Sequence, residues 1–523
     1  MAQGTMLELS TPSSSPVSLG PHEPLGASNV LPPVSPLAQP LPPAPSPDAL
    51  FPWLVRAGRR AGAFVNPKLR RDAPPPLRVP GLVAAAPLAP LEQLLCIPRH
   101  LQLTHERVQE RAPELVAAAP QLRREARIEC PEVVAFVARQ LHLLESRDAC
   151  DSADSWQSAD WFDLFFGMLL GSDFCNMPHR LLIGDETARR VFLPSFEVHN
   201  ADWNHSALCS AHAAVVRAVP VDFLATGFEL HRFVQAYLLL LTRTFGGAKH
   251  SGDWASAHVL VPLADLMNHS VEPNATWGFG ETGDFVVKAS RSIAADEEVC
   301  ISYGCDKSNV RLFRTYGFTI PPEAELCCSC RIWPSLVSDV YAAFLPEDLH
   351  RKVLDLETKR VDSNTCLVLE ACNRHGTKPA GFLRALCEHC LAKYADDPSL
   401  QAALQRMQSI RSAAPSSHEW WPLEGPPMIE ELSEAEDAPP GGAWLAESAL
   451  RVKMSEYLCL KAHLEALDVL EGKAEEAVCL SMAVDLLAPL RTALGDAERP
   501  RRGGGASGVS QALRVDSSAA LGR

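Results

Sequence analysis

The stretch from Leu260 to Phe318 places strand-like and polar segments in close succession, and this succession strongly limits the folds open to the chain. Val259, Val261 and Leu263 alternate as in a β-strand, and the polar run at residues 265–269 then interrupts the alternation. Polar side chains directly after an apolar strand are typical of a binding or catalytic site, because each can donate or accept hydrogen bonds.

The second half of this stretch predicts two further strands. Residues 285–287 continue the β pattern, residues 294–296 form a turn, and residues 299–303 alternate again, with one face ending in Tyr303. Tyr303 therefore lies at the end of a strand. It is followed by Gly304, whose missing side chain lets the backbone approach a ligand closely.

Three short motifs occur here in order: D-x-x-N-H-S at residues 265–270, E-E-V-x-I-S-Y-G at residues 297–304 and Y-G-F at residues 316–318. With strands between them, they resemble the SET-domain protein methyltransferases, and most of all the branch typified by the Rubisco large-subunit lysine methyltransferase. The likeness spans about residues 79–495 and is strongest over residues 257–318. The alternative for each motif by itself is a buried strand with a polar turn.

This resemblance implies an α+β fold, in which a SET-domain β-fold is split by a helical insertion and followed by an all-α substrate-binding domain. Apolar helical stripes at residues 133–144 and 233–241 fit the insertion. The organisation expected along the chain is a disordered Pro-, Ser- and Ala-rich leader with a basic segment at 1–77, the SET domain at 78–318 with its insertion at about 129–243, the helical domain at 319–495 and a disordered tail at 496–523.

The resemblance also implies a binding site for S-adenosylmethionine. Gly81 opens an apolar strand that is followed by a turn and a second apolar strand ending at Ile97, and it matches a turn that cradles the cofactor through its backbone. Val79 stands where the family has its first glycine, so one of two flexible positions is missing. Thr242-Arg243-Thr244-Phe245 matches the branch's Ser-Arg-x-Phe, which places Arg243 near the cofactor.

Other residues of the motifs receive roles in the same way. Asn268 can donate and accept hydrogen bonds at once, which suits the amino-acid end of the cofactor. The backbone near His269 is expected at the adenine, and Asp265 is expected to orient this turn. Tyr316 and Phe318 are expected to form a second aromatic wall of the cofactor or lysine channel, with core packing as the alternative.

Tyr303 is the catalytic tyrosine that the resemblance implies, and it is also counted with the cofactor-binding residues. A lysine ammonium costs about 4.6 kcal/mol to deprotonate at pH 7, and a desolvated channel beside a sulfonium lowers this cost. A phenol can hold a hydrogen bond there without carrying charge. The predicted activity is methyl transfer to a lysine of a protein substrate; histidine methylation and a catalytically silent SET-like interaction protein are the alternatives.

Composition limits the partners and the compartment. A net charge of -15 and a pI near 5.6 argue against a nucleic-acid surface and favour a protein partner with basic segments. No apolar run approaches the roughly 20 residues that span a bilayer, so no membrane segment is expected. The 16 cysteines form no repeated framework and indicate reduced thiols inside a cell, in the cytoplasm or nucleus, with the chloroplast also possible. The sequence does not indicate an oligomeric state.

Cys327, Cys328 and Cys330 raise the possibility of a zinc site, because many SET enzymes carry a cysteine cluster of this kind. Such a cluster needs a distant cysteine in the Asn-His loop, and Val271 occupies that position. We therefore expect no metal.

Overall fold

The computed structural model describes residues 46–73, 79–126, 128–145, 156, 159–170, 181–224, 228–246, 258–304, 306–413, 442–472 and 486–494. Contacts divide the chain into two compact units: the first contains the described residues up to Trp333 and those of Lys393–Cys459, and the second contains Pro334–Ala392 and the described residues from Leu460 onwards. The expected leader up to residue 45 and the expected tail at 496–523 lie outside the described residues. The predicted domain boundary after Phe318 stays a prediction.

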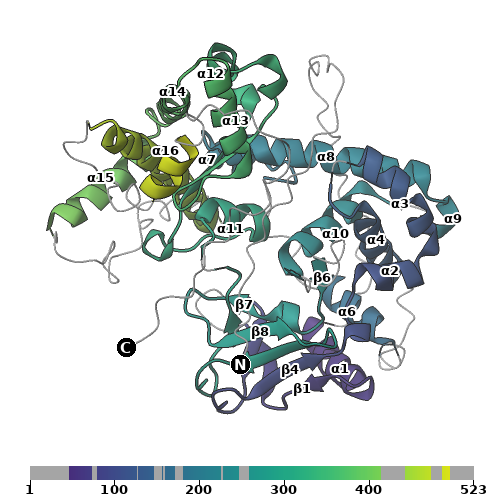
Figure 1. Ribbon diagram of the computed structural model, residues 1–523. Coiled ribbons are helices and arrows are strands. Elements are labelled where there is room, and N and C mark those ends of the chain that lie inside the picture. The colour runs from purple at the N-terminus through teal and green to yellow at the C-terminus, as the bar shows by residue number, and fades with distance from the viewer. Residues whose placement is uncertain are drawn as a thin grey trace. The chain divides into compact units, whose positions relative to one another are not determined.

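An antiparallel sheet of four strands forms the β-framework of the first unit (Figure 1). Phe285, Val287 and Ala289 point into the core from one face of the third strand, while Lys288 is exposed, so the alternation predicted for this segment is confirmed. The order of the strands is β1 (Phe64–Val65), β4 (Gln93–Ile97), β9 (Phe285–Ala289) and β8 (Ala275–Phe279).

Three strand pairs complete the β-structure around the motifs. Two are antiparallel, and the third is parallel and joins the Asn-His segment to the segment before Tyr303. The pairs are β2 (Leu69–Asp72) with β3 (Gly81–Ala84), β5 (Thr244–Gly246) with β6 (His258–Leu260), and β7 (Asn268–His269) with β10 (Cys300–Ile301). The strands expected on either side of the early turn, β3 and β4, are present but belong to different sheets.

The expectation that structure is missing before residue 78 is wrong for residues 46–73. Helix α1 (Pro47–Arg60) starts at Ser46, whose side chain accepts a hydrogen bond from the backbone of Ala49. Leu50 and Leu54 are fully buried in the main hydrophobic core. The prolines that suggested disorder include Pro47, and proline is favoured in the first turn of a helix because its ring fixes the backbone angle.

Helices form most of the described residues between β4 and β5. They begin at His105, earlier than the expected position near residue 129, because Thr104 caps the first of them by accepting from Arg107. The stripe predicted for residues 133–144 is confirmed, since Phe136 and its stripe neighbours are buried. The helices are α2 (His105–Arg111), α3 (Pro113–Glu125), α4 (Pro131–Glu145), α6 (Trp161–Leu170), α7 (Glu186–Phe192), α8 (Phe196–Ala218), α9 (Val221–Leu224) and α10 (Leu230–Arg243).

The described residues after β10 are mainly helical, and together with the sheets this confirms the predicted α+β class. The elements are α11 (Asn309–Tyr316), β11 (Ser329–Ile332), α12 (Ser338–Phe344), β12 (Leu354–Glu357), α13 (Ser363–Arg374), α14 (Pro379–Ala392), α15 (Pro398–Ala413) and α16 (Gly442–Leu470). Within the described residues, no helix is both long enough and apolar enough to cross a membrane. The substrate-binding role expected for residues 319–495 stays a prediction.

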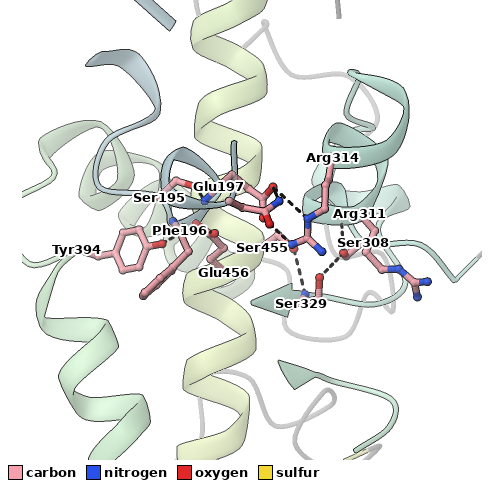
Figure 2. A network of polar contacts seen from close by, with 11 residues as sticks. Ser195, Phe196, Glu197, Ser308, Arg311, Arg314, Ser329, Tyr394, Ser455 and Glu456 are labelled. Atoms are coloured by element: carbon pink, nitrogen blue, oxygen red, sulfur yellow. Dashed lines mark hydrogen bonds and ion pairs between the residues drawn. The ribbon is translucent and has the colours of Figure 1, made fainter. Parts of the chain in front are cut away.

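A buried network around three glutamates, Glu197, Glu325 and Glu456, joins distant segments of the first unit, and we call it the glutamate network. Figure 2 shows its part around Glu197 and Glu456. Arg314 on α11 donates to both carboxylate oxygens of Glu197 at 2.5 and 3.2 Å. On α16, Glu456 accepts from the backbone N–H of Phe196 at 3.2 Å and from the hydroxyl of Tyr394 at 2.6 Å.

The third glutamate of the network holds the start of α11. Glu325 accepts from the backbone and the side-chain amide of Asn309 at 2.6 and 3.0 Å, and from the hydroxyl of Ser455 at 2.6 Å. Residues of α8, α11 and α16 are thereby linked through hydrogen bonds to buried carboxylates. This network fixes α11, whose last residue is Tyr316.

Candidate active site

The parallel pairing of β7 with β10 brings together the two motifs that are most distinctive in the sequence. Asn268 lies opposite Cys300, and His269 lies opposite Ile301. The chain enters β7 through a 3-10 turn at Ala264–Leu266, and the turn begins where Leu263 adopts a positive φ of 72°. This sharp turn interrupts the strand pattern and leaves the Asn-His pair next to the segment that ends in Tyr303.

Gly81 lies directly against the side chain of Asn268. A Cβ atom at Gly81 would stand 2.8 Å from Nδ2 of Asn268 and 2.5 Å from Oε1 of Glu298, which are distances that real Cβ atoms do not adopt. Asn268 donates through Nδ2 to Oε1 of Glu298 at 2.7 Å. A side chain at position 81 would therefore displace Asn268 and Glu298, while Val79 is exposed. The approach of a cofactor to the Gly81 backbone stays a prediction.

Arg243 and Asp265 form a buried ion pair. Nη1 of Arg243 lies 3.0 Å from Oδ2 of Asp265 and also donates to its backbone oxygen at 3.0 Å. Burial raises the pKa of Asp265, and the guanidinium of Arg243 opposes this shift. The other carboxylate oxygen, Oδ1, is buried and has no hydrogen-bond partner among the described residues. An unsatisfied buried acceptor of this kind is costly unless a ligand supplies a donor.

Tyr303 follows β10 and is held at both ends. Its hydroxyl donates to the backbone oxygen of Met267 at 2.8 Å, and its backbone N–H donates to Nδ1 of His269 at 3.1 Å. Burial raises the pKa of the phenol well above its ordinary value, so the group stays neutral at physiological pH. Gly304 comes next, with a φ of 132° that favours glycine.

Three aromatic rings lie around that of Tyr303. Its ring centroid lies 5.3 Å from that of His269, 4.6 Å from Tyr316 and 6.1 Å from Phe318. Gly317 ends α11 in the left-handed conformation with a φ of 77°, which turns the chain so that Phe318 also contacts His269 at 5.6 Å. The predicted aromatic wall residues therefore lie together with the predicted catalytic tyrosine.

The cluster is held electrically neutral. Burial lowers the pKa of His269 to about 4, with the positive charge of Lys307 acting in the same direction. Burial also raises the pKa of Tyr316 to about 12. Lys307 donates to the backbone oxygen of Tyr303, and its Nζ lies 5.9 Å from the centroid of the Tyr316 ring.

The structure thus groups the eight predicted residues through direct pairs: Gly81 with Asn268, Arg243 with Asp265, and His269, Tyr303, Tyr316 and Phe318 with one another. Glu298 and Lys307 are parts of the same site that the sequence did not single out. Glu298 is the second glutamate of the E-E-V motif, and its place directly before the strand that leads to Tyr303 was the available signal. Lys307 carried no such signal.

Metal ligands are not grouped in this region. Among the residues that the structure describes, no set of three or more His, Cys, Asp or Glu side chains is arranged to hold a metal ion. Cys327, Cys328 and Cys330 are buried at β11, and Val271 in the Asn-His loop is half exposed.

Comparison with known proteins identifies the framework of this site. The model of the SET domain matches residues 81–304. SET domain-containing protein 8 of Schizosaccharomyces pombe is 33% identical over 102 residues, which cover 20% of this chain and 21% of that protein. The chloroplastic ribulose-1,5 bisphosphate carboxylase/oxygenase large subunit N-methyltransferase of Pisum sativum is 35% identical over 104 residues, 18% of this chain and 20% of that protein. The chain therefore matches about a fifth of the length of these curated relatives.

Solved structures match over much more of the chain. The SET domain of LSMT bound to lysine and AdoHcy superimposes with a TM-score of 0.55 at 15% identity, covering 84% of this chain and 96% of that one. The structure of Rubisco LSMT bound to AdoMet gives a TM-score of 0.54 at 15% identity over 82% of this chain and 93% of that one. At this identity the likeness shows a shared fold.

Proposed function

We propose that this chain, which matches the SET domain model over residues 81–304, is an S-adenosylmethionine-dependent protein-lysine N-methyltransferase. The observation that carries the proposal is the position of Tyr303. Its phenol lies beside the turn that leads to Asn268, and its ring belongs to a neutral aromatic cluster. A methyl transfer needs such a junction, because it must align a donor and a nucleophilic nitrogen in a water-poor site.

The residues present fit the methyl donor. Asp265 offers an unsatisfied buried oxygen, and Gly81 leaves its backbone open where a Cβ would collide with Asn268 and Glu298. Arg243 orients Asp265 through its two hydrogen bonds. When bound, S-adenosylmethionine would supply a methyl group on a positively charged sulfur. We propose that Gly81, Arg243, Asp265, Asn268 and His269 hold it.

Tyr303 positions the reacting groups and takes no proton. Its phenol has a raised pKa and already donates to Met267, so a phenolate base would be unfavourable at physiological pH. Nδ1 of His269 is occupied by the backbone N–H of Tyr303, and the low pKa of this ring makes it a poor base. The lysine must therefore lose its proton to solvent as it approaches the aromatic cluster, where desolvation lowers its pKa.

Lysine is favoured over histidine as the acceptor because one neighbour of the same fold is bound to lysine. The rival function, a catalytically silent interaction protein, rested on the missing glycine at Val79. The tight packing of Gly81 against Asn268 supports cofactor binding despite Val79. The acidic net charge of -15 supports a protein substrate with basic segments.

Cofactor binding is the first test. S-adenosylmethionine at about 100 times its dissociation constant should stabilise the protein by about 2.7 kcal/mol, because it binds the folded state alone. Thermal unfolding and calorimetry measure this directly. If millimolar cofactor produced neither a shift nor heat, the interaction-protein alternative would replace the proposal.

The acceptor is tested separately with radiolabelled cofactor and cell extract, followed by mass spectrometry of the modified protein. A matched pair of peptides, in which the identified acceptor is lysine or histidine in the same sequence, then distinguishes the two chemistries. Label on the lysine peptide alone is the expected result. Label on the histidine peptide alone would support methyltransferase activity and overturn the proposed specificity for lysine.

A further inference from the structure

Glu298 joins the two strands that would hold the cofactor, although no role is assigned to it above. Its Oε1 accepts from Nδ2 of Asn268 on β7 at 2.7 Å. The same oxygen is the atom that a Cβ at Gly81 on β3 would approach to 2.5 Å. The backbone of Glu298 also forms a β-bridge with Val83, so its side chain starts from a position fixed against β3.

A second asparagine fixes the backbone around Glu298. Nδ2 of Asn274 donates to the backbone oxygen of Glu298 at 2.8 Å, and Oδ1 of Asn274 accepts from the N–H of Cys300 at 2.8 Å. Asn274 itself is buried. The carboxylate is therefore presented from a rigid segment, as a recognition group requires.

The pairing of Glu298 with Asn268 leaves acceptors available. Asn268 uses an amide N–H on Glu298, and within the described part of the chain neither its Oδ1 nor Oε2 of Glu298 has a hydrogen-bond partner. Two oxygens, Oδ1 of Asn268 on β7 and Oε2 of Glu298 just before β10, can both accept from a group that carries several N–H donors and a positive charge.

We propose that Glu298 recognises the α-ammonium group of the amino-acid end of the cofactor and at the same time orients the amide of Asn268. This inference rests on the proposed function, because it names the part of the methyl donor that Glu298 and Asn268 bind. It predicts a specificity: ligands that carry the amino-acid end need Glu298, whereas ligands that lack it do not.

The charge of Glu298 can be followed by pH when two probes are compared, because a group that both probes sense shifts both profiles alike. Burial raises the pKa of Glu298, whereas hydrogen bonds lower the pKa values of Glu297 and Asp72. Cys300, with a pKa of about 12, and His269, with a pKa of about 4, stay neutral near physiological pH. The remaining charged neighbours are Arg70, which pairs with Asp72, Arg291, which pairs with Glu297, and Asp296.

The experiment compares two probes on the full-length chain by calorimetry. S-adenosylhomocysteine carries the amino-acid end, and 5′-methylthioadenosine lacks it. Glu298→Gln keeps an oxygen that can accept from Asn268 and removes the charge, so it should weaken S-adenosylhomocysteine about tenfold or more while leaving 5′-methylthioadenosine within about twofold. Glu272→Gln, at an exposed site in the loop after β7, is the control for net charge. It should change the affinity for neither probe.

A pH series on the unmodified protein supplies the second readout and needs no variant. The affinity for S-adenosylhomocysteine should fall as the pH drops through the raised pKa of Glu298, and the affinity for 5′-methylthioadenosine should not follow it. Equal losses for both probes in Glu298→Gln, or identical pH profiles for the two probes, would overturn the inference in favour of a structural role. If the unmodified protein bound neither probe, the proposed function would fail with it.

Discussion

The glutamate network and the candidate active site are both buried polar regions of the first unit, but they differ in how fully the oxygens of their carboxylates are hydrogen-bonded. In the network, each carboxylate oxygen of Glu197, Glu325 and Glu456 accepts a hydrogen bond. At the site, Asp265 keeps one buried oxygen without a partner among the described residues. The network carboxylates thus find their hydrogen bonds within the protein, whereas Oδ1 of Asp265 can accept one from a bound ligand.

The two regions also differ in charge. Arg314 forms two hydrogen bonds to Glu197 inside the network, so formal charges meet there directly. The aromatic cluster around Tyr303 is neutral instead, because burial moves the pKa values of His269 and Tyr316 away from physiological pH. A neutral cluster suits methyl transfer to an uncharged amine, since it offers no competing ion pair. The comparison therefore predicts stability effects in one region and turnover effects in the other.

The largest effect is expected when the network loses a charge. Arg314→Ala leaves the carboxylate of Glu197 buried and without its cation, which should destabilise the protein by about 3 to 5 kcal/mol. Chemical denaturation measures the loss. The control is Arg190→Ala, which breaks an exposed ion pair with Glu186 and should cost less than about 1 kcal/mol. Similar losses in the two variants would show that the network does not hold the unit.

The second effect concerns turnover rather than stability. Tyr303→Phe removes only the hydroxyl, so the ring contacts remain, while the alignment at the junction loses one polar contact in a water-excluded site. Such a contact is typically worth about 2.7 to 4 kcal/mol of transition-state stabilisation, so kcat should fall about 100- to 1,000-fold. Steady-state kinetics with the acceptor peptide and calorimetry with the cofactor measure the two quantities.

Tyr341→Phe is the matched control for this change. The hydroxyl of Tyr341 also donates to a backbone oxygen, that of Lys352 at 2.9 Å, and the residue is fully buried. Both variants should lose about 1 kcal/mol of stability by deletion of this hydrogen bond. Only Tyr303→Phe should lose turnover; parental turnover in this variant would make Tyr303 a structural residue.

The candidate site was predictable from the sequence because its residues lie in short motifs whose strand context is local. The alternation around Phe285 and the turn near Asp296 place the segment of Tyr303 beside the Asn-His pair, as the β7–β10 pairing shows. Gly317 is equally local, since a glycine after a helix predicts the turn that returns Phe318. The roles of these residues stay predictions until binding and kinetics test them.

The glutamate network was not predictable in the same way. Glu197, Arg314 and Glu456 lie on three helices that are far apart in the sequence, and no periodicity indicates which buried charge meets which. Glu298 was missed for a related reason: its partners, Gly81 and Asn268, come from two distant strands.

Helix α1 shows a different limit. Composition averaged over residues 1–77 indicates disorder, because prolines and small residues dominate it. The helix depends on the spacing of a few residues within this segment, since Leu50 and Leu54 are one turn apart and both are buried. Averaging hides such a short periodic segment. The earlier prolines indicate disorder, whereas Pro47 favours the start of a helix.

The smallest effect that distinguishes the two regions is a dependence of stability on pH. Burial raises the pKa of Glu456 to about 8 and that of Glu325 to about 7, from an ordinary value of 4.5. The stability that a raised pKa contributes is fully present below the unfolded pKa and is lost as the pH rises through the folded one. His269 has a lowered pKa of about 4, so its contribution has the opposite sign and is complete above about 6.5.

Between about pH 6.5 and pH 8 the network should therefore dominate, and the free energy of unfolding should fall as the pH rises, by at most about 1.4 kcal/mol per pH unit for each proton. Glu456→Gln should flatten this fall, because it removes the carboxyl that titrates. The hydrogen bonds can remain, since the glutamine oxygen still accepts from Phe196 and the hydroxyl of Tyr394 can accept from the new amide. Urea denaturation at a series of pH values measures the slope, with Glu186→Gln at an exposed site as the control. A parental slope in Glu456→Gln would assign the titration to other groups and remove the distinction drawn between the two regions.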